Sequence, residues 1–207
     1  MTSLNPLKTI GAQIMEAVAL HQGLKGAAAK EKTLEYLRDV ASPTRKRFKQ
    51  YPARVLRRMR QRVVIAIAVA CSPKILICDE PTTALDVTIQ AQILQLLKEM
   101  RFKYDLTIVM ITHDLGVVAN IADRVAVMYA GDIVEIGTAD EIYYDPRHPY
   151  TWALLSSMPQ MGVKGEDLFN IVGTPPNLFA EIRGDAFAPR NPQALKIDLS
   201  SARLTLR

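Results

Sequence analysis

The segment from Ile75 to Glu80 joins four consecutive apolar residues directly to two acidic ones. A continuous apolar run of this length predicts a short buried strand. In an open sheet of parallel strands, the carboxyl ends of the strands face the crevice where ligands bind. We therefore expect Asp79 and Glu80 to stand at such a crevice. The alternative is a strand that simply ends in a solvated acidic pair.

Helices and further apolar strands alternate around this segment, which predicts an α/β fold with a mainly parallel sheet covered by helices. The expected helices are Arg60–Ala70, Thr88–Phe102 and Leu115–Ile121, and the other expected strands are Leu106–Ile111, Arg124–Tyr129 and Ile133–Ile136. Upstream, Pro6 can open a helix and Ala27–Val40 is rich in helix formers. Downstream of His148 we expect one more helix and then a loose tail from Gly162.

Three side chains of this region suit phosphate chemistry. Asp79 could hold Mg²⁺, which takes one or two carboxylates together with phosphate oxygens. Glu80 could orient an attacking water. His113, in Thr112-His113-Asp114, follows the next strand at the same sheet edge, where an imidazole can donate a hydrogen bond to a γ-phosphate. A lone histidine is more often structural, but here the motif and its expected position agree.

The net charge of +5 is concentrated between Arg45 and Arg62, where nine basic residues occur without an acidic one. Such a cluster is compatible with nucleic-acid binding or with a solvated helix face near a partner. The longest wholly apolar run, Val63–Cys71, is too short to cross a bilayer. Two cysteines, Cys71 and Cys78, make no disulfide framework, and a reducing cytosol is the simplest compartment.

Taken together, the motifs resemble the ATP-binding subunit of an ABC transporter, in the branch of bacterial oligopeptide and dipeptide importers. ILICDEPTTALD resembles a Walker B motif running into the D-loop, and MITHD resembles the switch-histidine region. RVAVMYAGDIVEIGTADEIYYDPRHPYTWALL resembles the end of the nucleotide-binding domain entering the peptide-importer extension, which His148-Pro149-Tyr150 marks. MTSLNP resembles the segment that follows the Q-loop glutamine.

The resemblance implies a P-loop NTPase fold of the ABC ATPase type, with a helical subdomain and a C-terminal extension. Its parts are a helical and signature subdomain over 1–58, an α/β core over 59–137 and the peptide-importer extension over 138–207. It also implies ATP and Mg²⁺ as cofactors, with Mg²⁺ on Asp79, water on Glu80, the γ-phosphate sensed by His113, and Asp86 coupling two nucleotide sites.

The implied partners are a second ABC ATPase subunit, two transmembrane permease subunits and an extracellular or periplasmic peptide-binding protein, with no nucleic acid. The implied location is peripheral, on the cytoplasmic face of the bacterial inner membrane. The implied activity is ATP hydrolysis that powers uptake of oligopeptides or dipeptides.

The sequence departs from this family in two functional motifs. It contains no GxxxxGK[ST] loop, whose amides and lysine hold the phosphates. We expect that loop, the Q-loop glutamine and the first strands of the domain upstream of Met1, and we expect the present chain to be inactive alone. Leu56-Arg57-Arg58 stands where the family carries a Ser-Gly-Gly signature. Arginine side chains there should obstruct the close backbone approach to the partner's γ-phosphate that glycine permits.

A shifted reading frame explains this second departure. Ala53–Arg58 can be encoded GCA CGA GTT CTC CGG CGG, and removal of the first base gives His-Glu-Phe-Ser-Gly-Gly, a typical signature of the family. Gene decay and sequencing error both remain open as its cause. The terminal Leu199–Arg207 could be another shifted segment. Gly184–Pro192 has no cysteine, so we expect no iron–sulfur cluster, which needs thiolates.

Two other functions remain open at this stage. The chain could be a non-catalytic remnant that docks on the transporter without hydrolysing ATP. It could also be a basic nucleic-acid-binding protein. Restoring the signature would weaken this alternative, because it would remove three arginine residues and add one glutamate.

Overall fold

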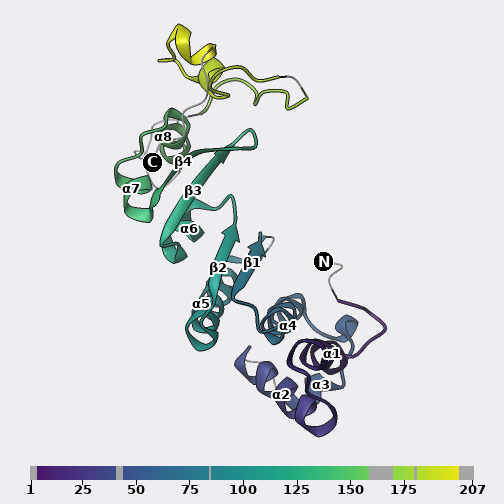
Figure 1. Ribbon diagram of the computed structural model, residues 1–207. Helices are drawn as coiled ribbons and strands as arrows, with labels where there is room; N and C mark the ends of the chain where they lie inside the picture. The colour runs from purple at the N-terminus through teal and green to yellow at the C-terminus, as the bar shows by residue number, and fades with distance from the viewer. Residues whose placement is uncertain (1–3, 41–43, 84, 159–169, 180, 201–207) are drawn as a thin grey trace. The chain divides into compact units, whose positions relative to one another are not determined.

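The computed structural model describes residues 4–40, 44–83, 85–158, 170–179 and 181–200 (Figure 1). Contacts within the chain divide it into two compact units, Met1–His113 and Asp114–Arg207. The three-part division at 58/59 and 137/138 remains a prediction. No helix among the described residues is long and apolar enough to cross a membrane.

The first unit begins with a group of packed helices. They are α1 (Ile10–Gln22), α2 (Gly26–Asp39), α3 (Thr44–Phe48), the 3₁₀ turn η1 (Pro52–Arg54) and α4 (Arg57–Ala70). Helix α1 is opened by Thr9, whose hydroxyl accepts a hydrogen bond from the Ala12 amide at 3.3 Å, and not by Pro6. Ile10, Ile14 and Val18 recur at helical spacing and are fully buried, because they pack α1 against its neighbours.

A parallel strand pair forms the rest of the first unit. Strand β1 (Ile75–Asp79) pairs with β2 (Thr107–Ile111), with Ile75 opposite Thr107 and Asp79 opposite Ile111. The crossover between them is α5 (Val87–Tyr104), which buries its apolar side. This confirms the expected order of strand, helix and strand, and the parallel ladder places both carboxyl ends at one edge.

Only one face of this strand pair is covered within the described residues. Leu76 and Cys78 are buried on that face, whereas Ile75 and Ile77 of β1 and Val109 and Ile111 of β2 are exposed on the other. The side chains alternate because successive residues of a strand point to opposite faces. The expectation of a sheet covered by helices is therefore met on one face only.

The second unit is built around an antiparallel hairpin. Its elements are α6 (Leu115–Ile121), β3 (Arg124–Tyr129), β4 (Asp132–Thr138), α7 (Ala139–Tyr144), α8 (Pro149–Ser156) and the 3₁₀ turns η3 (Ala188–Arg190) and η4 (Lys196–Leu199). Ala130 and Gly131, with φ of +51° and +92°, make the two-residue turn between β3 and β4. The two strands of this unit are antiparallel, unlike β1 and β2, because so short a turn joins only antiparallel strands.

The segment after α8 packs on this hairpin. The Phe187 ring lies 5.5 Å from Tyr129 of β3 and 5.4 Å from Tyr150 of α8, centroid to centroid, and is fully buried. Arg190 donates to the Tyr129 hydroxyl at 3.2 Å and to the Ile171, Val172 and Gly173 carbonyls at 2.9, 3.0 and 2.9 Å. Residues 171–173 and 187–190 are thus anchored, which corrects the expected loose tail for these parts. Its part at 162–169 lies outside the described residues.

Candidate functional site

The chain turns sharply where β1 ends. Glu80, the residue after the strand, has φ of +44°, a left-handed conformation that is strained for a residue with a side chain. Its amide donates to the Ile111 carbonyl at 2.9 Å, and its own carbonyl accepts from the Thr83 amide at 3.2 Å. These two bonds hold the turn against the end of β2. Such strain costs about 1–3 kcal/mol and persists only where the surroundings impose it.

The Glu80 carboxylate is held by two neighbours. One oxygen accepts from the Thr83 hydroxyl at 2.7 Å, and the other lies 2.9 Å from Nδ1 of His113. The Thr83 bond and then the His113 bond lower the pKa of Glu80, because both stabilise its charged form. The structure therefore joins Glu80 and His113, which the sequence placed at one sheet edge. Thr83 was missed, although a hydroxyl three residues beyond the acid is a recognisable signal for such a bond.

The tautomer of His113 follows from this contact. A carboxylate only accepts hydrogen bonds, so Nδ1 carries a proton when it bonds Glu80. In the neutral ring Nε2 is then an acceptor, and it becomes a donor only in the imidazolium. For His113 to donate to a phosphate oxygen, it must either be protonated or release Glu80. The imidazole is exposed, which leaves its ring accessible to a ligand.

Asp79 stands beside this pair with an unsatisfied carboxylate. It is the last residue of β1 and lies on the exposed face. Its side chain makes no hydrogen bond or ion pair within the described part of the chain. No group of three or more histidines, cysteines or acids that could hold a metal occurs among those residues. One free carboxylate suits Mg²⁺, which keeps several waters and takes few protein ligands when it binds phosphates.

Asp86 has a clear local role. It is the N-cap of α5, and its carboxylate accepts from the Ile89 amide at 2.9 Å. A cap of this kind is worth about 1 kcal/mol to helix stability. The bond accounts for an aspartate at this position without any partner subunit, so the coupling role of Asp86 stays a prediction.

Leu56, Arg57 and Arg58 form the start of α4, which begins three residues earlier than predicted. Leu56 is the N-cap and offers no side-chain acceptor, while Arg57 and Arg58 are the first two helical residues. Positive charges at a helix N-terminus oppose the helix dipole, at about 0.3–1 kcal/mol each. The position where the family's signature was expected is thus an uncapped, positively charged helix start, and its assignment as a degenerate signature stays a prediction.

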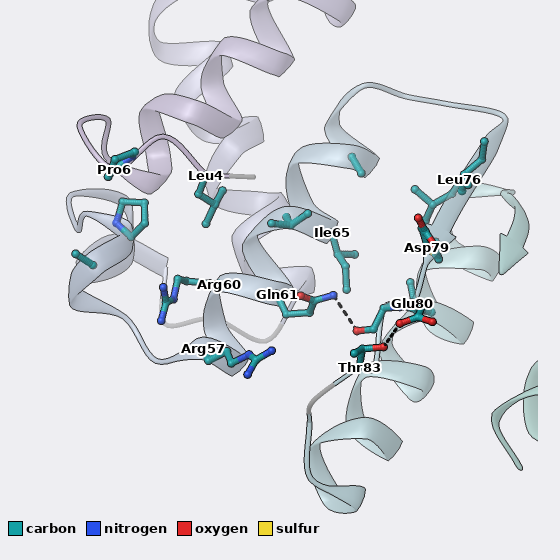
Figure 2. Close-up of a pocket in the computed structure, with 18 residues that line it drawn as sticks. Leu4, Pro6, Arg57, Arg60, Gln61, Ile65, Leu76, Asp79, Glu80 and Thr83 are labelled. Atoms are coloured by element: carbon teal, nitrogen blue, oxygen red, sulfur yellow. Dashed lines mark hydrogen bonds between the residues drawn. The ribbon is translucent and has the colours of Figure 1, made fainter. Parts of the chain in front are cut away.

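A pocket of about 710 Å³ separates this helix from the end of β1. Its α4 wall includes Arg57, Arg60 and Gln61, and its other wall includes Asp79 and Glu80 (Figure 2). The Gln61 amide donates to the Pro81 carbonyl at 2.9 Å and so ties the two walls together. Gln61 was not singled out from the sequence, since nothing local indicates a bond to a residue twenty positions away.

The site combines a parallel strand pair that ends in Asp-Glu, a histidine that contacts the glutamate, and a helical subdomain earlier in the chain. Together these features define a segment of an ABC-type ATPase. Among solved structures, the chain matches the post-hydrolysis dimer of the ATP-binding cassette MJ0796 bound to ADP and Pi. The TM-score is 0.57 and the identity 27%, over 66% of this chain and 59% of that one. Residues 134–197 match the family described as oligopeptide/dipeptide transporter, C-terminal region.

Curated relatives specify the branch. The chain is 59% identical to the oligopeptide transport ATP-binding protein AmiE of Streptococcus pneumoniae over 199 residues, covering 96% of this chain and 56% of AmiE. It is 59% identical to OppD of Bacillus subtilis over 200 residues, with 96% and 56% covered. For DppD of Bacillus subtilis, a dipeptide transport ATP-binding protein, the identity is 52%, with 95% and 59% covered. The chain belongs to the oligopeptide/dipeptide transport ATP-binding proteins, and it spans 56–59% of the length of these three relatives.

Proposed function

We propose that this chain supplies the Walker B, switch-histidine and C-terminal parts of an ATP-hydrolysing subunit that powers oligopeptide or dipeptide uptake. The observation that carries the proposal is the Glu80 carboxylate, bonded to Thr83 and His113 beside the free carboxylate of Asp79. Relatives named as oligopeptide and dipeptide transport ATP-binding proteins support the substrate class.

The proposed roles follow from the chemistry of each side chain. Bound MgATP would supply the phosphate to be transferred and the metal that neutralises its charge. Asp79 would hold the metal, since its carboxylate has no other partner within the described residues. Glu80, kept ionised by Thr83 and His113, would accept a hydrogen bond from water and orient it. His113 would contact the γ-phosphate, and Asp86 would couple two sites.

The proposed assembly has a second ATPase subunit, two permease subunits and a peptide-binding protein, at the cytoplasmic face of the inner membrane. We further propose that the present 207 residues do not turn over ATP alone, because they contain no GxxxxGK[ST] loop and Arg57 and Arg58 replace the signature. Asp79, Glu80 and His113 serve the site of a P-loop in the same subunit, whereas the signature serves the partner's site.

Phosphate release from four versions of the chain tests this proposal, each assembled with the transporter in membranes. The versions are the chain itself, the chain with Ala53–Arg58 replaced by His-Glu-Phe-Ser-Gly-Gly, the chain fused to a preceding segment that carries a GxxxxGK[ST] loop, and both changes together. Only the last should give full turnover, and Glu80→Gln should abolish it. Full, Glu80-dependent turnover from the signature replacement alone would show that no P-loop is missing. No turnover from the combined version would favour a non-catalytic docking protein.

A further inference from the structure

A buried histidine lies where three segments of the second unit meet. His148 is the N-cap of α8 and is 6% exposed. Its backbone amide donates to the carboxylate of Glu135, on β4, at 3.0 Å. Its Nε2 atom lies 3.7 Å from Oδ1 of Asp185, and its ring centroid lies 6.5 Å from that of Phe187. The imidazole is therefore enclosed by residues that are far apart in the chain, and none of the proposed ATPase roles uses it.

The hydrogen bond that caps α8 fixes the protonation state of this ring. Nδ1 of His148 accepts from the Tyr150 amide at 3.1 Å. An amide N–H only donates, so Nδ1 carries no proton, and the proton of the neutral ring is on Nε2, toward Asp185. A second proton can enter only at Nδ1, where it displaces the hydrogen bond from the Tyr150 amide. The charged ring and the cap of α8 are thus mutually exclusive.

The charges around the ring are few. Asp185 faces Nε2, and the Glu135 carboxylate accepts the amides of Arg147 and His148 at 2.8 and 3.0 Å. The guanidinium of Arg147 bonds a neighbouring aspartate, and that of Arg190 donates to three carbonyls and a tyrosine hydroxyl. The titratable side chains on the elements that pack around the ring are Asp185, Glu135, Arg147, Arg190, Tyr129 and Tyr150.

Burial decides the balance between these effects. It lowers the pKa of His148 below the ordinary value of about 6.5, and the charges of Asp185 and then Glu135 oppose it without cancelling it. A hydrated histidine binds a proton more readily than this buried one. The stability of the closed form is therefore full above a pH of about 6.5, and it is lost as the pH falls from there toward the lower pKa of the closed form.

We propose that His148 is an acid-sensitive latch for the segment 184–191, which its neutral form holds closed on α8 and its protonated form releases. Phe187 and Asp185 of this segment lie against the imidazole, so their departure admits water to the ring. The hairpin can stay folded meanwhile, because β3 and β4 are joined by their own ladder of backbone hydrogen bonds. The latch does not involve nucleotide, so it stands apart from the proposed ATPase function.

Hydrogen exchange of backbone amides, followed by NMR on the full chain, measures opening of the segment. The amides to follow are those of Phe187, which donates to Asp185 at 3.0 Å, and Arg190, which donates to the Phe187 carbonyl at 2.8 Å. Their protection factors should fall by up to about tenfold between pH 6.5 and 5.5, the limit for uptake of one proton over one pH unit. Protection of the β3–β4 ladder should fall less.

The matched variant is His148→Asn, because asparagine is a strong N-cap that does not titrate. Its protection factors at Phe187 and Arg190 should be nearly equal at the two pH values. A fall as large as that of the unmodified chain would place the titration on a carboxylate and would overturn the latch. An equal fall in the β3–β4 ladder of the unmodified chain would show unfolding of the whole unit and would overturn it too.

The pKa of His148, measured from the carbon shifts of its imidazole, tests the latch independently of that variant. A value at or above about 6.5 in the unmodified chain would overturn the proposal. Asp185→Asn keeps an acceptor for the Phe187 amide and removes the negative charge, so it should lower the pKa of His148 further. An unchanged pKa in this variant would refute the contact between the ring and the segment. These measurements need neither nucleotide nor transporter, so their failure is distinct from a failure of the turnover experiment above.

Discussion

Replacing Phe187 with alanine should destabilise the second unit more than any other single truncation near its C-terminal segment. Phe187 is 2% exposed and contacts the rings of Tyr129 and Tyr150. Truncation of a buried phenylalanine to alanine costs about 3–5 kcal/mol, because it removes buried area and leaves a cavity. Domains of this size are stable by only about 5–15 kcal/mol, so the loss would bring the unit close to unfolding.

Urea unfolding measures this loss, and the single tryptophan of the chain reports it. Trp152 lies on α8, in the same unit as Phe187. With a urea slope of about 1.5 kcal/mol per molar, a loss of about 4 kcal/mol lowers the midpoint by roughly 2–3 M. The matched control is Phe179→Ala, because Phe179 belongs to the same segment and is fully exposed; its midpoint should be nearly unchanged.

Equal midpoints for Phe187→Ala and Phe179→Ala would refute the packing of this segment on the β3–β4 hairpin. A shift below about 1 kcal/mol for Phe187→Ala, at an unchanged slope, would do the same, since it is less than burial of the ring requires.

Four further predictions concern the first unit. Thr83→Val should raise the pKa of Glu80 toward the ordinary glutamate range, because the Thr83 bond is the main cause of its depression; carbon NMR of the carboxylate during a pH titration measures it, and an unchanged pKa would contradict the contact. Stability due to ionised Glu80 should be present above the unfolded-state pKa and be lost as the pH falls through the lower folded-state pKa. MgATP should bind these 207 residues alone more weakly than a Kd of about 10 μM by titration calorimetry, and tighter binding would contradict the proposal that they lack the main phosphate-binding loop. Ile77→Thr with Val109→Thr should reduce self-association in sedimentation velocity by removing exposed apolar side chains, whereas Leu76→Thr, on the buried face, should destabilise the fold instead.

Local patterns predicted the first unit well. The apolar run at Ile75 and the period of 3.6 in α5 gave the strand and the crossover helix, because both elements bury the residues that define them. The parallel pairing then followed from the connection, since a helix of that length between two strands favours it. The sequence predicted that Glu80 and His113, which are 33 residues apart, lie at the same edge of the sheet. Its hydrogen bond was not, because it depends on the left-handed turn at Glu80.

The second unit was harder to predict because long-range contacts decide it. The bounds of α6 and β3 and a turn at Gly131 before β4 were predicted from local patterns. The antiparallel pairing of β3 with β4 was not, because it depends on two positive φ angles at Ala130 and Gly131. Helix α7 was overlooked although Thr138 and Glu141 form a capping box, a signal that was present in the sequence. Arg190 donates hydrogen bonds to three carbonyls and to a tyrosine up to 61 positions away. Sequence periodicity does not predict contacts between residues so far apart.

The left-handed backbone of Glu80 has a consequence for laboratory evolution. Glycine adopts this conformation freely and asparagine adopts it readily, so either replacement should relieve strain worth about 1 kcal/mol or more. Selection of random variants for heat resistance alone should therefore enrich Gly or Asn at this position. Under selection for the proposed peptide uptake, the water-orienting role proposed for Glu80 predicts that the carboxylate is retained, because neither replacement carries an ionised oxygen. The residue recovered at position 80 would then reveal which of the two pressures a population had experienced.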